Sequence, residues 1–264
     1  MKKLNKTAAL QWFTALAFAL CITGCSKSND DITETGTETE TGTETETSDT
    51  MYYNLIRVEN FMATTEDNTT TAAVTLYYSL ESNKQVDATY KKTRTWDLAF
   101  GGLYNSFLSG NNGANSLNNG YGTSAVGGIL ILEQAFDDVV DVPADSDFKT
   151  GADLIGTDDY GAFGSGVGWY VYDFDGDLVR DGEYEDAHIA YAMADSLTLK
   201  SGTVVPPRTI VVKTAKGNYA KIKMISCYKD LFTQDSWYRT APHMYFTFEY
   251  VLVPAGSTKF EVKD

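Results

Sequence analysis

Histidine and cysteine are scarce in this chain, whose 264 residues include two histidines and three cysteines. Cys21 lies in the apolar amino-terminal segment and Cys25 directly follows that segment, so Cys227 stands alone in the remainder. A disulfide framework within one chain and a thiolate metal cluster are therefore excluded. The chain also lacks a Gly-x-Ser-x-Gly segment, and we predict that it is not an enzyme. Its many carboxylates leave a glycosidase open as the alternative.

Basic residues are outnumbered by acidic ones. The whole chain has 21 lysines and arginines against 36 aspartates and glutamates, a net charge of −15. Residues 51–264 carry 17 basic and 28 acidic residues, a net charge of −11. This charge opposes binding to phosphate backbones and electrostatic docking on anionic lipid. We therefore expect no nucleic-acid partner.

No apolar run in the amino-terminal segment is long enough to span a membrane. Residues 1–24 have a basic start, formed by Lys2, Lys3 and Lys6, and continue with a short, mostly apolar stretch, a pattern typical of a secretion signal peptide. The segment ends in Ile22-Thr23-Gly24-Cys25, which resembles a bacterial lipobox. An ordinary signal peptide cleaved nearby is the alternative. We expect Cys25 to be the lipid-attachment residue, and its acyl chains to hold the protein at a membrane.

Large apolar residues are missing from Thr33–Thr47, a repeat of threonine, glutamate and glycine. Such a segment cannot bury a core and is predicted to be a solvated, disordered tether. The preceding Ser26–Asp31 has a lysine followed by acidic residues and resembles the surface-export signal of Bacteroidota lipoproteins. We predict a signal peptide over 1–24, a lipidated cysteine with its tether over 25–50, and a folded domain over 51–264, located at the cell surface on the outer membrane.

Strand patterns dominate the folded part. Thr209–Thr214 is rich in β-branched residues, and Gly217 in the following turn suits the positive φ of a hairpin. The next strand alternates small or apolar residues with lysines. We expect Ala220, Ile222 and Met224 to face the core, and Lys221 and Lys223 to face water.

Two further segments alternate in the same way, Trp96–Phe100 and His243–Val253. In the first we expect the three large apolar residues to point inward, and Asp97 to face outward or to cap a neighbouring loop. Helix signals are scarce, and Tyr184–Ser196 is the best candidate for a helix. The sequence therefore predicts an all-β fold of antiparallel sheets packed face to face, with few helices.

Two glycine-containing segments have open interpretations. Ser109–Gly128 is rich in glycine and asparagine and is either a ligand-facing loop or a long irregular connection. It does not match a phosphate-binding loop. Asp173–Asp177 is similar to the start of a calcium loop, but the EF-hand spacing fails. A hairpin turn explains it more simply, and a weak calcium site is the alternative.

Four segments together resemble one family. They are Trp96–Phe100, Gly168–Tyr172, Arg208–Lys221 and Phe246–Ser257. Their order and content are similar to those of the HmuY-like lipoproteins of Bacteroidota, over about residues 77–260. The resemblance implies an all-β, hand-shaped domain on a surface lipid anchor. It also implies haem binding for iron acquisition, together with an outer-membrane haem receptor.

The resemblance implies two axial iron ligands between the glycine-rich loop and the Arg208 hairpin. Pro143–Gly168 contains neither histidine nor methionine. The chain also carries extra residues relative to the family, about Phe174–Val204, and these contain His188 and Met193. Both are candidate axial ligands. The alternatives are a half-buried histidine in a polar segment and a methionine that fills the core.

Aromatic residues near this window are candidates for apolar contact with a ligand. Trp169 and Tyr172 are expected to act as walls without coordinating iron. His243 lies outside the window and is interpreted as structural, and we expect no metal beyond a haem iron. Two functions follow. The chain binds haem or a related porphyrin-type ligand for uptake, or it is a non-haem surface binding or assembly module on the same fold.

Overall fold

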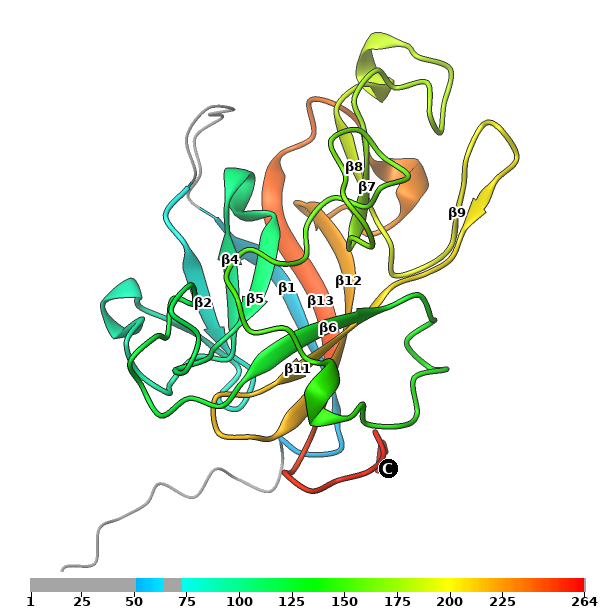
Figure 1. Cartoon of the computed structure of the whole chain (residues 1–264). Helices are drawn as coiled ribbons and strands as arrows, with labels where there is room; N and C mark the ends of the chain where they lie inside the picture. Colours follow the sequence, from blue (N-terminus) through cyan, green and yellow to red (C-terminus); the bar gives the residue numbers. More distant parts are fainter. Residues whose placement is uncertain (1–50, 64–72, 264) are drawn as a thin grey trace, which may run out of the picture. The chain divides into compact units, whose positions relative to one another are not determined.

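A computed structural model describes residues 51–63 and 73–263 of the chain (Figure 1). These residues form thirteen strands and five short 3-10 helices, and no α-helix is found among them. The all-β class expected from the sequence is therefore confirmed. No helix in the described ranges is long and apolar enough to cross a membrane. The predicted lipid-attachment residue Cys25, the signal peptide over 1–24 and the tether over 25–50 lie outside the described residues.

The predicted hairpin forms the centre of a five-stranded antiparallel sheet. The strand order is β1-β13-β12-β11-β6. The strands are β1 (Leu55–Met62), β13 (His243–Val253), β12 (Tyr219–Tyr228), β11 (Thr209–Lys213) and β6 (Gly128–Leu132). Gly217 has a φ of +96° in the β11–β12 turn, as the hairpin geometry requires. Figure 1 labels the five strands of this sheet as β1, β13, β12, β11 and β6.

A second antiparallel sheet of four strands packs against one face of the first. Its order is β3-β2-β4-β5, with β2 (Leu76–Ser79), β3 (Lys84–Val86), β4 (Leu98–Gly101) and β5 (Phe107–Gly110). Aromatic rings from the two sheets interdigitate. The ring centroids of Tyr78 and Phe248 are 5.5 Å apart, and those of Phe100 and Phe246 are 4.8 Å apart. This is the face-to-face packing that the alternating strands predict.

Asp97 ties these sheets together at one end. Its carboxylate is buried and accepts hydrogen bonds from the backbone N–H groups of Leu80 and Ala215, at 2.8 and 3.0 Å. One of the two sequence alternatives, that Asp97 caps a neighbouring loop, is therefore confirmed. Trp96, Leu98 and Phe100 are all fully buried, as expected.

The second face of the large sheet is covered as well, and this corrects one expectation. Phe136, Val139 and Phe260 pack with Val211 and Val251 on that face. Lys221 lies on the same face and is buried instead of facing water. Its ammonium group donates to the carbonyls of Phe136 and Val139, at 2.7 and 3.1 Å, and lies 4.3 Å from the centre of the Phe136 ring.

The extra residues after Phe174 form strands instead of the expected helix. Tyr184–Asp186 is a single 3-10 turn, and β8 (Ile189–Ala192) pairs with β7 (Tyr170–Asp173). Apolar Ile189 and Tyr191 of β8 are both buried at spacing two, which is the strand period. The chain then forms a two-stranded ribbon of β9 (Leu197–Thr198) and β10 (Val204–Val205). Figure 1 shows β7 and β8 side by side, with the β9 ribbon next to them.

The helical turns are all of the 3-10 type and three residues long. They are η1 (Ala88–Tyr90), η2 (Leu103–Asn105), η3 (Asp145–Asp147), η4 (Tyr184–Asp186) and η5 (Gln234–Ser236). They connect strands and form no layer of their own.

The asparagine-rich segment between β5 and β6 is held by its own side chains. The Asn118 side-chain amide donates to the carbonyls of Gly110 and Thr150, both at 2.8 Å. The Asn111 side-chain amide donates to the backbone carbonyl of Trp96 at 2.8 Å. Both asparagines are buried. Their amides serve the loop itself, which favours the long-connection interpretation of this segment over the ligand-facing one.

Candidate functional site

Four ring side chains gather where β7 ends and β8 begins. Phe174 follows β7, and His188 precedes β8, where its backbone N–H donates to the Phe174 carbonyl at 3.2 Å. The segment before β7 runs alongside that strand, because the Ala162 N–H donates to the Tyr172 carbonyl at 2.8 Å. This contact brings Phe163 next to Tyr172. We call Phe163, Tyr172, Phe174 and His188 the aromatic cluster.

The rings of the aromatic cluster contact one another and remain open to solvent. Phe163 and Phe174 meet edge to face, with centroids 5.5 Å apart, and Phe174 meets His188 at 4.7 Å. The exposed fraction is 81% for Phe163 and 41% for Phe174. Adjacent exposed phenylalanines form an apolar surface that a folded protein normally hides unless it binds something there.

The imidazole of His188 is oriented by Tyr172. The tyrosine hydroxyl lies 2.9 Å from Nδ1 of His188. Burial raises the pKa of Tyr172 to about 12, so its hydroxyl is neutral at physiological pH. When Nδ1–H donates to this hydroxyl, Nε2 holds a free lone pair, and no hydrogen bond reaches Nε2 from the described part of the chain. Burial and the nearby Arg239 lower the pKa of His188, which favours the neutral imidazole.

Two members of the aromatic cluster have left-handed backbones. The φ angle is +61° at His188 and +63° at Phe163. A positive φ is uncommon for residues other than glycine, and it is a true outlier for a bulky side chain such as phenylalanine. Eight other non-glycine residues of the described chain, Tyr53, Tyr104 and Met244 among them, share this conformation, so it is common in this fold.

Of the other residues singled out in the sequence, Met193 and Trp169 lie in the core. Each is 1% exposed, and the Trp169 indole N–H donates to the Ser106 carbonyl at 2.7 Å. Met193 matches the core-filling alternative. The structure therefore brings Tyr172 and His188 together and places Met193 and Trp169 in the interior.

His243 has a different environment, at the start of β13. Its Nδ1 lies 2.9 Å from the Ala241 carbonyl oxygen, and its ring contacts Tyr104 and Tyr228 at 6.3 and 6.4 Å. These contacts fit the structural interpretation.

The acidic segment after β7 forms a turn. Both Asp173 oxygens accept backbone hydrogen bonds, from Gly176 at 2.8 Å and from Val179 at 3.1 Å. Asp173 is buried, and Gly176 has a φ of +80°. Within the described residues no group of three or more potential metal-binding side chains is present. The hairpin-turn interpretation therefore accounts for this segment.

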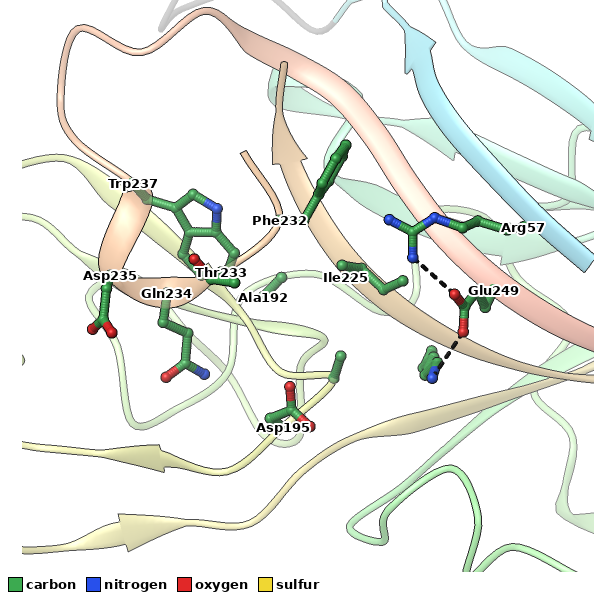
Figure 2. Close-up of a pocket in the computed structure, with 12 residues that line it drawn as sticks. Arg57, Ala192, Asp195, Ile225, Phe232, Thr233, Gln234, Asp235, Trp237 and Glu249 are labelled. Carbon is green, nitrogen blue, oxygen red and sulfur yellow. Dashed lines mark hydrogen bonds and ion pairs between the residues drawn. The ribbon is translucent and has the colours of Figure 1, made fainter. Parts of the chain in front are cut away.

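A separate pocket of about 360 Å³ lies beside the exposed part of the large sheet's second face. One wall comes from the sheet and includes Arg57 of β1, Lys223 of β12 and Glu249 of β13. The other wall comes from residues 192–195 and 232–237. Figure 2 shows the ion pair of Arg57 and Glu249 on one side, and Asp195, Gln234 and Asp235 on the other.

Phe163 and Phe174 belong to the aromatic cluster but were not predicted from the sequence as site residues. Phe163 is the only large apolar residue in the glycine-rich stretch Gly161–Gly168 apart from a valine. A bulky apolar residue inside a flexible, polar loop is the signal that could have identified it. The pocket residues gave no such signal, because they come from five separate segments.

Comparison with known proteins supplies the family. The family model described as "HmuY protein" matches residues 71–250, more than half of the chain. None of the curated proteins compared is detectably similar to this chain.

Three solved structures are similar at low identity. One is an apo HmuY analogue of Tannerella forsythia, with 14% identity, a TM-score of 0.33 and coverage of 76% of this chain and 97% of that one. Another is a candidate lipoprotein of Bacteroides fragilis, with 14% identity, a TM-score of 0.30 and coverage of 75% and 89%. The third is a candidate HmuY-like haem-binding protein of Bacteroides vulgatus, with 13% identity, a TM-score of 0.29 and coverage of 76% and 92%. Because these TM-scores are low, the assignment rests on the family model, which shows that the chain belongs to the HmuY family.

Proposed function

We propose that this protein is a cell-surface lipoprotein that binds haem or a related porphyrin-type ligand at the aromatic cluster, for uptake. The observation that carries the proposal is the oriented imidazole of His188 within an exposed group of aromatic rings. Membership of the HmuY family supports the ligand class, because the family resemblance implies haem binding. Cys25 would anchor the protein at the outer membrane, and an outer-membrane haem receptor would accept the ligand.

The side chains of the aromatic cluster suit a flat, apolar ligand. Phe163 and Phe174 present ring surface to solvent, and covering that surface is favourable by roughly 25 cal/mol per Å² of apolar area. Arg239 stacks on Tyr184 with its guanidinium carbon 4.3 Å from the ring centre, and its backbone N–H donates to the Glu185 carbonyl. It thereby places a positive charge near His188, which suits a ligand with an anionic edge.

His188 supplies the coordinating atom. Haem offers an iron atom that accepts an axial nitrogen, sulfur or oxygen ligand. His188 would present Nε2 for this role in the tautomer whose Nδ1–H donates to the Tyr172 hydroxyl, and that contact orients the ring, as partners of metal-binding histidines usually do. The aromatic cluster contains no second histidine and no methionine. His188 is therefore the residue of the cluster that would hold the iron, because the Tyr172 hydroxyl, the other potential ligand atom there, contacts its Nδ1.

Haemin titration of the full-length protein in detergent tests the proposal, with protein-free micelles as the blank. Wild type should shift the Soret band in a saturable way. His188→Asn should reduce the shift strongly, because it removes the imidazole, and asparagine tolerates the positive φ at this position. Phe163→Ser should weaken affinity while the band position stays that of wild type, because it removes contact surface only.

His243→Asn is the matched control and should bind like wild type. If wild type shows no saturable shift at micromolar haemin, the haem proposal fails. The surviving function is then the non-haem surface module on the same fold. If His188→Asn binds with the wild-type spectrum and affinity, His188 is not the axial ligand.

A further inference from the structure

The pocket on the second face of the large sheet, lined by Arg57, Lys223, Glu249, Asp195, Gln234 and Asp235, has no part in the proposed haem site. None of its lining residues belongs to the aromatic cluster. Its volume of about 360 Å³ lies within the range of small-molecule sites, which begins near 300 Å³. We propose that this pocket binds a neutral, polyhydroxylated ligand, that is, one or two sugar rings.

The sheet wall of the pocket is an ordered set of donors. Glu249 accepts from Arg57 and from Lys223, both at 2.8 Å, and Arg57 also pairs with Glu59 at 2.6 Å. Burial pushes the pKa of Glu249 up, but the bonds from Lys223 and Arg57 outweigh it and hold that pKa below its ordinary value. The carboxylate thus fixes two cations in place while each keeps further N–H groups directed away from it.

The opposite wall supplies acceptors. Asp195 and Asp235 form no ion pair within the described residues, and Gln234 lies between them along the wall in Figure 2. The Gln234 amide nitrogen donates to the Ser196 carbonyl at 3.4 Å, and no hydrogen bond reaches its amide oxygen from the described residues.

This distribution of charge selects the ligand class. An anion would meet Asp195 and Asp235, and a cation would meet Arg57 and Lys223, so a net charge of either sign meets like charge on one wall. A hydroxyl group both donates and accepts, so a polyol can satisfy both walls at once. The floor between the walls includes Ile225, which suits the C–H face of a sugar ring.

The pocket is also rigid, as a binding site requires. The Trp237 indole N–H donates to the Leu231 carbonyl at 3.0 Å, and its ring stacks on Tyr228 at 5.7 Å. Arg180 donates to the carbonyls of Trp237 and Gln234, at 2.7 and 2.8 Å, and holds the η5 segment in place. A wall that is ordered before binding lowers the entropic cost of binding.

Calorimetric titration of the full-length protein, in a detergent without a sugar headgroup, tests the proposal. The probes are glucose, galactose, mannose, N-acetylglucosamine and their β-linked disaccharides, with glucuronate and glucosamine as charged analogues and putrescine as a non-sugar cation. We expect saturable binding of at least one neutral sugar, with a change in tryptophan fluorescence because Trp237 lines the pocket. The matching charged analogues should bind more weakly.

Asp195→Ala and Gln234→Ala should each weaken that binding about tenfold or more, which corresponds to the loss of one or two hydrogen bonds. Asp141→Ala is the control, because Asp141 pairs with Lys259 and does not line the pocket. His188→Asn should leave sugar binding unchanged, so failure of the haem proposal and failure of this one are separate results. The proposal is overturned if no neutral sugar binds saturably, if glucuronate or putrescine binds more tightly, or if both pocket variants bind like wild type.

Discussion

At the scale of single residues, two neighbouring lysines with the same sequence pattern have different roles. The buried ammonium group of Lys221 donates to the backbone carbonyls of Phe136 and Val139. Lys223 is partly exposed and forms an ion pair with Glu249. Burial lowers the pKa of Lys221. Its charge is tolerated because the carbonyl oxygens and the ring face replace part of its hydration.

Lys221→Met should therefore lower the free energy of unfolding by about 1–3 kcal/mol, because it leaves the Phe136 and Val139 carbonyls without a donor. Lys223→Met should cost no more than about 1 kcal/mol, the usual scale of a partly exposed ion pair. Chemical denaturation of both variants measures the difference. Equal losses would show that the two carbonyls do not depend on the buried ammonium group.

Alternation along β12 could not reveal this difference. Period two states which residues share a face, and Lys221 and Lys223 do share one. Whether that face is wet depends on what covers it, and Phe136, Val139 and Phe260 come from segments far away in the sequence. The positions of Ala220, Ile222 and Met224 were predictable, because apolar residues at that spacing need a core in any all-β fold.

At the scale of secondary-structure elements, the β7–β8 hairpin carries the haem proposal. The sequence favoured a helix at Tyr184–Ser196, and the element is a short strand in which Ile189, Tyr191 and Ala192 are buried. Four residues are too few for periodicity to separate the two structures. Pairing with β7 determines that this segment is a strand. The same pairing brings His188 beside Phe174 and Tyr172.

Haem binding by this hairpin should depend on pH in a defined direction. Burial and Arg239 lower the pKa of His188 from its ordinary value of 6.5. The neutral imidazole, which coordinates iron, therefore persists to a lower pH than in an exposed histidine. We expect the Soret shift to be complete above pH 6.5 and to be lost only as the pH falls through the lowered pKa.

The Soret shift followed against pH measures this titration, with circular dichroism at each pH to exclude unfolding. Residual binding in His188→Asn should lack the titration, because the variant has no imidazole at this position. A midpoint above pH 6.5 would contradict the lowered pKa.

At the scale of the whole molecule, the chain combines one folded domain with a long amino-terminal region that is predicted to connect it to a membrane. Within the described residues, the two proposed sites share no side chain: the aromatic cluster lies at one end of the β7–β8 hairpin, and the pocket lies on the second face of the large sheet and includes Ala192 at the end of β8. Each site can therefore be tested with its own ligand and its own variants. Family membership follows from the sequence over residues 71–250, whereas the sites depend on contacts between distant segments.

The anchor prediction concerns the chain as a whole. Cys25 follows an apolar segment that ends in small residues, and acylation of its thiol would give the protein a membrane affinity that the folded domain, with its net charge of −11, would not supply electrostatically. Cys25→Ala should abolish incorporation of a labelled fatty acid and move the protein from the detergent phase to the aqueous phase. Cys21→Ala should keep both properties, because Cys21 belongs to the predicted signal peptide and would leave with it. Equal partitioning of Cys25→Ala and wild type into detergent would show that another feature of the chain holds it at the membrane.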